Sequence, residues 1–205
     1  MSNSDTGRSA SRGRRPGAPD TRAEILASAR TLFAARGLGS TSLRAIAADA
    51  GVDPALVHHY FRSKDDLFVA ALELPVDPRV VLLPVLEGGL DGAGERLLRV
   101  FVSVWDDETA RLSLLGLVRG VFEPTGRQLL RDGLLGVVLG PLAPALGIDD
   151  EPERRIALVA SQMIGLVMLR YVLEVEPLAS MGQDVLVATY APTLQRYLEG
   201  PLPPL

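Results

Sequence analysis

Residues 43–67 constrain the fold most, because they predict two short helices joined by a tight turn, with a third helix behind them. Ile46, Ala47 and Ala50 repeat at helical spacing and are expected to face inward. Gly51 follows as a residue that tolerates positive φ, which lets the chain turn sharply. This pattern is typical of a helix-turn-helix, whose second helix lies in the major groove of DNA.

Polar side chains mark where each of these helices begins. Ser42, Asp53 and Ser63 are placed to cap the three helices, since each side-chain oxygen can accept a hydrogen bond from an unpaired amide. Pro54 stands in the first turn of the second helix, where a missing amide hydrogen costs nothing. We therefore expect the third helix to start at Lys64 and to run to about residue 74, ahead of two prolines.

The residues of this stretch and those just before it also fit a known family pattern. The matching residues are Thr41, Ser42, Leu43, Arg44, Ile46, Ala47, Ala50, Gly51, Val52, Tyr60, Phe61, Ser63, Lys64 and Leu67. Residues 21–70 thereby resemble the N-terminal domain of the tetracycline-repressor (TetR) family of transcriptional regulators. Asp53 and His58 differ from the residues more usual there, Ser and Tyr. The resemblance implies an all-α fold, with a three-helix DNA-binding domain followed by a helical ligand-binding and dimerisation domain.

The DNA contacts are expected on the second helix of this unit and around it. The first turn of that helix offers only apolar contact, for example to a thymine methyl group. His59 can reach a base edge or a phosphate, whereas Tyr60 and Lys64 are expected on phosphates, which position the protein without reading sequence. The full set of expected DNA-binding residues is Thr21, Arg22, Thr41, Ser42, Arg44, Asp53, Pro54, Ala55, Leu56, His58, His59, Tyr60 and Lys64.

A first helix is predicted ahead of this unit. Thr21 and Glu24 have the spacing of a capping box, and Gly37 is expected to end the helix. Its role is mainly to carry the other two helices. Thr21 and Arg22 stand at its N-terminus, where backbone amides favour a phosphate.

Residues 1–20 form a polar, Arg-rich arm that has too few apolar side chains to fold alone. Residues 12–16 resemble an AT-hook, whose arginines lie in a narrow minor groove. A solubilising tail is the alternative, and the sequence leaves both open.

The net charge of −4 hides an asymmetry along the chain. Residues 1–68 hold ten Lys and Arg against seven Asp and Glu, whereas the remainder is acidic. A basic N-terminal part suits a nucleic-acid partner, because only the contacting surface needs attraction to phosphate. The chain has no cysteine, no secretory signal and no apolar run long enough for a membrane span, which is compatible with the cytoplasm.

From residue 77 onward the pattern is helical and broken by Gly and Pro, without strand alternation. No nucleophile–base pair, phosphate loop or metal-ligand spacing stands out, so neither an enzyme nor a cofactor is expected. The adjacent His58 and His59 point to different faces of a helix and do not predict a metal site. The expected organisation is an arm at 1–20, a DNA-binding domain at 21–74, a ligand-binding and dimerisation domain at 77–199 and a tail at 200–205.

Aromatic and Met residues in the C-terminal region suit an apolar cavity among helices, and simple core packing is the alternative. Polar residues inside apolar stretches are either paired internally or wait for a ligand, because a buried unpaired group costs about 1–3 kcal/mol. The expected ligand-binding residues are Phe101, Trp105, Arg119, Phe122, Gln162, Met163 and Tyr171.

The last two long helices are expected to pair two subunits, as the resemblance implies a four-helix dimer interface. One helix-turn-helix makes too few contacts for specificity, and a two-fold dimer reads a palindrome. The expected interface residues are Ile156, Ala160, Ile164, Gly165, Met168, Leu186, Thr189, Thr193 and Tyr197.

The sequence therefore predicts a cytoplasmic homodimeric repressor that binds double-stranded DNA at a palindromic operator, and that a small apolar or amphipathic effector releases. Two alternatives remain at this point. One is a constitutive DNA-binding regulator that senses no ligand. The other is a helical carrier or interaction protein in which DNA binding is vestigial.

Overall fold

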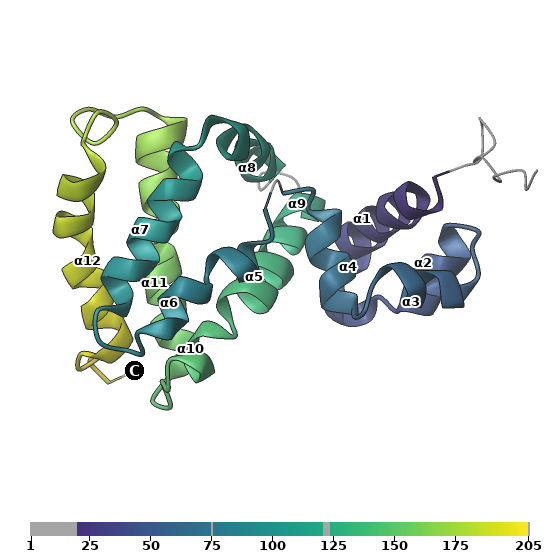
Figure 1. Cartoon of the computed structure of the whole chain (residues 1–205), viewed down its shortest axis with the longest axis horizontal. Helices are drawn as coiled ribbons and strands as arrows, with labels where there is room; N and C mark the ends of the chain where they lie inside the picture. The colour runs from purple at the N-terminus through teal and green to yellow at the C-terminus, as the bar shows by residue number, and fades with distance from the viewer. Residues whose placement is uncertain (1–19, 75, 121–123, 205) are drawn as a thin grey trace, which may run out of the picture.

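The computed structural model describes residues 20–74, 76–120 and 124–204, and every regular element in these ranges is helical (Figure 1). The all-α prediction is confirmed. The Arg-rich residues 1–19 and Phe122 lie outside the described residues. The elements are α1 (Thr21–Ser40), α2 (Leu43–Asp49), α3 (Pro54–Tyr60), α4 (Lys64–Ala71), α5 (Pro78–Val81), α6 (Leu83–Glu87), α7 (Ala93–Asp106), α8 (Glu108–Gly120), α9 (Pro124–Leu129), the π-helix η1 (Leu130–Leu139), α10 (Leu142–Ala145), α11 (Pro152–Val167), the π-helix η2 (Met168–Val172) and α12 (Gln183–Glu199).

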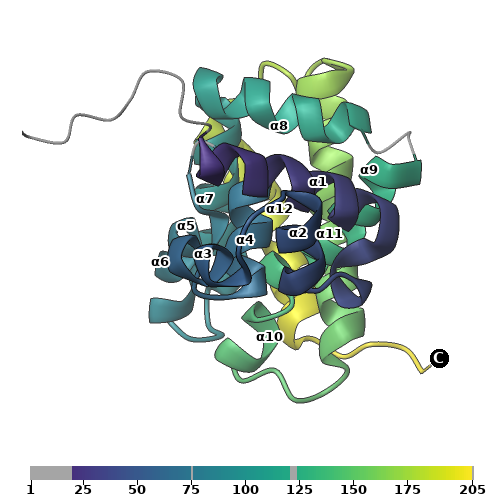
Figure 2. The ribbon, with the colours of Figure 1, turned by 90° about the vertical axis from the view of Figure 1, so that its right-hand side faces the viewer.

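Helices α1 to α4 gather at one end of the molecule, and Figure 2 views them in front of the other helices. Their apolar faces close on one cluster of buried side chains, which holds Ile46 and Ala47 as the sequence predicted. Phe33 and Phe68 meet in it, with ring centroids 5.3 Å apart. Helix α1 carries the other three because its apolar face lies at the centre of the cluster.

The start of α1 corrects one prediction. Asp20, and not Thr21, is the capping residue, since its carboxylate accepts hydrogen bonds from the amides of Arg22 and Ala23 at 3.2 and 3.3 Å. The capping box at Thr21 was therefore placed one residue too late. Gly37, which was predicted to end the helix, instead interrupts it three residues before its end, with φ of 79°, a value that favours glycine.

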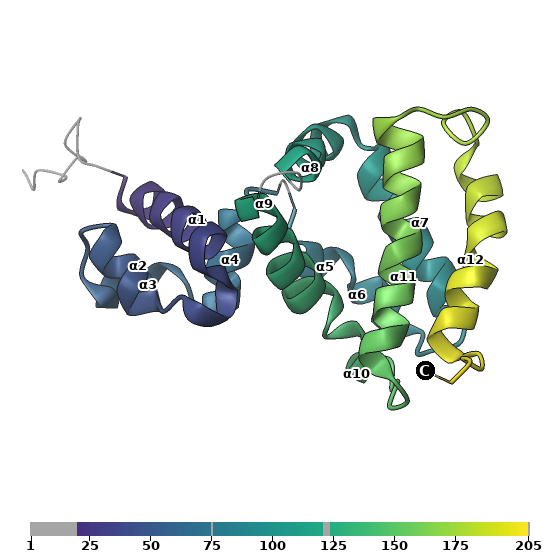
Figure 3. The same ribbon diagram turned by 180° about the vertical axis from the view of Figure 1, so that it is seen from behind.

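The C-terminal helices form a second apolar cluster. Helix α12 packs along α7 and α11, and α10 lies across the end of α11 (Figure 3). Helix α11 continues directly into the π-helical turn η2, and α9 continues directly into η1. Pro192 lies inside α12.

Helices α9 and η1 join the two ends of the molecule. Helix α9 packs alongside α1 (Figure 3). Within η1, Val137 is buried in the cluster of α1 to α4, whereas the next residues, Val138 and Leu139, are buried in the C-terminal cluster. Gly133 lies against the ring of Phe68, which occupies the space that a Cβ would need.

One described helical stretch, Pro152–Val172, has the length and apolar content of a membrane span. This is a weak indication, because the core helix of a soluble protein meets the same criteria. Ile156, Val159 and Met163 of this stretch are buried among the other C-terminal helices.

Candidate nucleic-acid interface and apolar cavity

The predicted caps position the helix-turn-helix. Each side-chain oxygen accepts a hydrogen bond from the first turn of its helix, which confirms the three capping predictions. The bonds join Ser42 Oγ to Ala45 N (3.1 Å), Asp53 Oδ1 to Ala55 N (2.7 Å) and Ser63 Oγ to Asp66 N (3.0 Å).

The turn between α2 and α3 is fixed by its backbone conformation, by a hydrogen bond and by a buried side chain. Gly51 has φ of +67°, as its role in the turn requires, and the amide of Val52 donates to the carbonyl of Ala47 at 2.9 Å. Val57 of α3 is fully buried and fixes that helix to the core. The outer face of α3 is thereby set by the packing of its inner face.

Ser28 of α1 adds a contact that the sequence did not indicate. Its hydroxyl is buried, lies 3.2 Å from the carbonyl oxygen of Ile46 and donates to Asp49 Oδ2 at 2.6 Å. The C-terminal end of α2 is thus tied to α1. The only sequence signal for this role is a polar residue at a position where the apolar periodicity of α1 points inward.

The outer face of α3 is exposed and contains no Lys or Arg. Leu56 and Tyr60 are 39% and 42% exposed, and the rings of His59 and Tyr60 contact each other edge to face at 5.4 Å. The exposed residues of α3 and its cap are Asp53, Pro54, Ala55, Leu56, His58, His59 and Tyr60. All seven belong to the expected DNA-binding set.

Cationic side chains flank this face. Arg22 and Arg44 are exposed, and the Arg22 guanidinium lies 5.5 Å from the centre of the Phe61 ring. Lys64 is half-buried, and its ammonium donates to the carbonyl of Leu38 at 2.8 Å. An ammonium has three donors, so this bond leaves capacity for a phosphate. Thr21 is half-buried, and Ser42 is exposed.

Thr41 does not belong to the interface, and the prediction that it contacts DNA is wrong. Its side chain is 2% exposed, and its hydroxyl lies 2.8 Å from the carbonyl of Gly37 and 3.2 Å from that of Leu32. Thr41 therefore satisfies carbonyl groups where α1 ends. The family sequence pattern includes both residues that contact DNA and residues that hold the helix-turn-helix together, so it does not tell the two roles apart.

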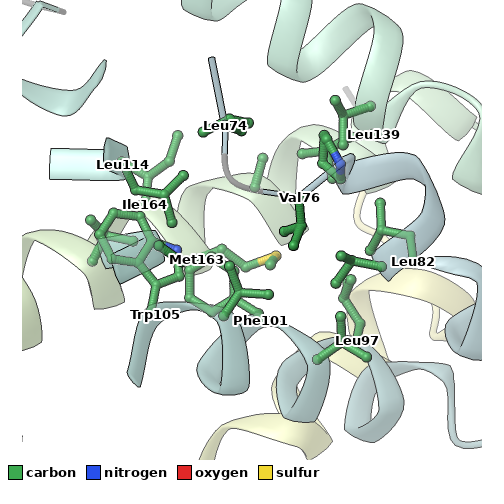
Figure 4. Close-up of a pocket in the computed structure, with 18 of the residues that line it drawn as sticks. Leu74, Val76, Leu82, Leu97, Phe101, Trp105, Leu114, Leu139, Met163 and Ile164 are labelled. Carbon is green, nitrogen blue, oxygen red and sulfur yellow. The ribbon is translucent and has the colours of Figure 1, made fainter. Parts of the chain in front are cut away.

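An apolar cavity of about 300 Å³ lies among α5, α7, α8, η1 and α11, and Figure 4 shows the side chains that surround it. Every described residue that lines it is apolar, and the indole N–H of Trp105 is the one polar group among those side chains. Phe101 and Trp105 contribute neighbouring rings, 6.0 Å apart and tilted by 44°. Leu74 and Val76, which follow α4, and Leu139 of η1 also line the cavity.

Three of the seven predicted ligand-binding residues, Phe101, Trp105 and Met163, line this cavity. Arg119 is exposed, and Gln162 is half-buried on a part of α11 that does not line it. These two residues therefore do not line this cavity. Helical spacing does not tell which face of a helix looks into it. Leu74, Val76 and Leu139 were missed, since single aliphatic residues carry no signal.

Tyr171 lies behind the cavity wall rather than in it. Its ring stacks on Trp105 at 5.2 Å, and its hydroxyl donates to Asp106 Oδ1 at 2.9 Å. Burial, and the hydrogen bond to Asp106 after it, raise the pKa of Tyr171 to about 12. Arg170 donates to the carbonyls of Leu178 and Met181, at 2.7 Å each. These polar groups hold the wall of the cavity in place.

An ion pair crosses the junction between α4 and α5. Arg79 lies 2.7 Å from Asp66 of α4 and 2.7 Å from Asp77, the residue that caps α5. Its hydrogen bond to Asp77 lowers the pKa of that carboxyl against a smaller opposing effect of burial. Pro78 and Val81, which flank Arg79, line the cavity.

The expected dimer residues divide into three groups. Ile156, Ala160 and Leu186 are 8%, 5% and 0% exposed inside the subunit's own core, so their assignment to an interface is wrong. Ile164 and Met168 line the cavity. Among the others, Thr189 is exposed, and Gly165, Thr193 and Tyr197 are half-buried.

Large apolar side chains that were not assigned to the interface are exposed on η2 and α12. Leu169 and Val172 of η2 are 42% and 38% exposed, and Val185 of α12 is 59% exposed. The helical pattern alone did not separate these exposed apolar residues from those that pack inward.

Comparison with known proteins matches both parts of the chain. Residues 25–71 match the family described as bacterial regulatory proteins, tetR family, and residues 91–198 match the tetracyclin repressor-like C-terminal domain. The HTH-type transcriptional regulator AcrR of Shigella flexneri is 37% identical over 101 residues, which cover 40% of this chain. The matched region spans about half, 47%, of that relative.

Solved structures extend the comparison over the whole chain. The crystal structure of a TetR-family regulator from Streptomyces coelicolor is 41% identical, with 91% of this chain and 98% of that chain covered and a TM-score of 0.46. The multidrug binding protein EbrR complexed with proflavin is 21% identical, with coverage of 87% and 99% and a TM-score of 0.44. On the two family matches, the chain belongs to the TetR family of transcriptional regulators.

Proposed function

We propose that this regulator represses transcription by binding a palindromic operator as a homodimer, and that a small apolar molecule in the cavity releases it. One observation carries the proposal. The cavity is lined by the residues that directly follow α4 and by η1, the two segments that connect the DNA-binding helices to the rest of the chain.

The DNA side of the proposal uses the exposed face of α3 and its cationic flanks. We assign direct base contact to the apolar first turn of α3 and to His59, because no long polar side chain is present on that helix. Arg22, Arg44 and Lys64 are assigned to phosphates. The complete proposed interface is the expected set without Thr41: Thr21, Arg22, Ser42, Arg44, Asp53, Pro54, Ala55, Leu56, His58, His59, Tyr60 and Lys64.

The first connection from the cavity to α3 runs through η1. Val138 and Leu139 line the cavity, and Val137 beside them is buried against the DNA-binding helices. A ligand that pushes on Leu139 therefore acts on a segment that cannot move without disturbing the packing of Phe68 on Gly133. Packed segments of this kind convert small displacements into discrete shifts.

The second connection runs through the end of α4. Leu74 and Val76 line the cavity, and Arg79 joins α5 to Asp66 of α4. A ligand that binds better in one position of this segment shifts the population of α4 orientations. In a dimer, a tilt of α4 changes the separation of the two α3 helices, and so the fit to two half-sites one helical turn apart.

The dimer is assigned to the exposed apolar residues Leu169, Val172 and Val185, together with Thr189. A two-fold axis beside these residues would pair η2 and α12 of one subunit with the same elements of the other. We assign the protein to the cytoplasm, where its operator lies.

The experiment is a fluorescence-anisotropy titration of the full-length protein with DNA from upstream of its own gene, with and without uncharged aromatic compounds. We expect tighter binding than to scrambled DNA, a strong salt dependence and release by at least one compound. Sedimentation of the free protein should show a dimer. Specific binding that no compound weakens would favour a constitutive regulator, and equal binding to scrambled DNA would favour vestigial DNA binding.

A further inference from the structure

The lining of the cavity specifies the charge of the molecule that fits it. Each described lining residue is apolar, from Leu74 and Val76 at one side to Phe101 and Trp105 at the other (Figure 4). We propose that the cavity takes an uncharged, largely apolar molecule with an aromatic part, and that it excludes ions of either sign. This inference rests on the proposed function of the cavity as the effector site.

Asp106, which follows Trp105 in the chain, is engaged away from the cavity lining. Asp106 accepts a hydrogen bond from Tyr171, whose ring stacks on Trp105, and lies 3.6 Å from Arg170. The Nε atom of Arg170 has no hydrogen-bond partner, but Arg170 does not line the cavity. A bound ion would therefore lose its hydration without gaining a counter-charge from any described lining residue, which strongly disfavours binding.

The shape of the lining favours rings and alkyl groups. The tilted rings of Phe101 and Trp105 offer a face and an edge to a ligand ring, the arrangements that aromatic groups prefer. Met163 and Met168 lie nearby, and their flexible thioethers adapt to irregular apolar shapes. A volume of about 300 Å³ is within the range of small-molecule sites.

The single tryptophan of the chain is in this wall, so its emission reports on the cavity itself. The test titrates the full-length protein with three probes and follows Trp105 emission. N-phenyl-1-naphthylamine is uncharged, 8-anilinonaphthalene-1-sulfonate has the same ring skeleton with an added sulfonate, and 1-naphthylmethylammonium is a cation of similar width. We expect the uncharged probe to bind at least about tenfold tighter than either ion.

A matched pair of variants places a carboxylate inside or outside the cavity. Leu114 of α8 lines it, whereas Leu112, two residues earlier, is 67% exposed. Leu114→Glu should weaken the uncharged probe by at least about tenfold and strengthen the cation, and Leu112→Glu should change neither. An unfolded Leu114→Glu variant would weaken all probes together, so the opposite response of the cation separates a charge effect from misfolding.

The outcomes separate this inference from the proposed function. An ion that binds the wild-type protein within about threefold of the uncharged probe overturns the inference on charge. No change of Trp105 emission with the uncharged probe, up to its solubility limit, overturns it as well. Neither result bears on operator binding, and release of operator DNA by a charged compound would leave the sensing function intact while contradicting the inference.

Discussion

The two ends of the molecule are packed to different degrees. In α1 to α4 the core side chains of Phe33, Ile46 and Phe68 are at most 1% exposed and belong to one closed cluster. The C-terminal helices instead surround a cavity of about 300 Å³. The difference matches what each region has to do. A surface that must fit DNA needs fixed side chains, whereas a site for a small molecule needs space that its own residues do not fill.

The largest expected effect tests this difference directly. Ile46→Ala removes a fully buried side chain from the closed cluster and should cost about 2–5 kcal/mol of unfolding free energy. Met163→Ala should cost about half of that or less, because the Met163 side chain already faces empty space on one side. Urea unfolding followed by circular dichroism measures both. Equal losses would mean that the cavity is filled in solution.

A single methyl group added in η1, which joins the two ends of the molecule, should affect DNA binding without affecting the cavity. Gly133→Ala forces a methyl group into the ring of Phe68, so α4 or η1 must shift. We expect operator affinity to fall by about tenfold, or about 1.4 kcal/mol, while the uncharged probe still binds near Trp105.

Gly136 provides the control for this prediction. It is exposed on the same element, and a Cβ there would meet no atom within 4 Å, so Gly136→Ala should leave operator affinity unchanged. Combining Gly133→Ala with Phe68→Leu should recover part of the affinity. Normal DNA binding by Gly133→Ala alone would argue against coupling through η1.

The exposed face of α3 and its flank yield the next contrast. Lys64→Ala should weaken binding by a few-fold on all DNA sequences, with a smaller salt slope, because a phosphate contact carries no sequence information. His59→Ala should change the preferred bases at one position, at a cost of about 1–3 kcal/mol at the preferred site. Binding-site selection with each variant measures both effects. Identical preferred sites for wild type and His59→Ala would remove His59 from base reading.

The smallest expected effect concerns the ion pair between α4 and α5. Because the folded protein lowers the pKa of Asp77 below its ordinary 3.8, Asp77 stabilises the fold above that pH and loses the contribution as the pH falls below it. Asp77→Asn should therefore destabilise the protein near pH 6, by less than about 1 kcal/mol for such a partly exposed pair. The difference from wild type should shrink towards pH 3. A difference that stays constant with pH would assign the effect to the cap alone.

The N-terminal and C-terminal ends of the molecule also differ in how much of their structure the sequence could predict. The caps Ser42, Asp53 and Ser63 and the turn at Gly51 act within a few residues of their own position, so the sequence predicted the helix-turn-helix almost residue by residue. The all-α fold class was implied by the family resemblance and by the absence of strand alternation after residue 77. Thr41 was assigned to DNA because its hydrogen bond to the carbonyl of Gly37 depends on how the chain turns at the end of α1, which the sequence does not show.

The C-terminal site depends on distant parts of the chain and was predicted only in part. Phe101, Trp105 and Met163 could be selected because their size or flexibility suits a cavity. Which apolar face of α11 looks inward is decided by α7, α10 and α12 together, and no spacing within α11 encodes it. For this reason Ile156 and Ala160 were assigned to a partner subunit although they contact their own core.

The adjacency of Val137 and Val138 has a thermodynamic consequence. Two consecutive residues of η1 complete two different cores, so the N-terminal helices lose a packing partner if the chain is cut before η1. A fragment that ends after α4 would lack Gly133, against which the ring of Phe68 packs. The full chain should consequently melt in one cooperative transition, and any compound that raises its melting temperature stabilises the DNA-reading helices as well.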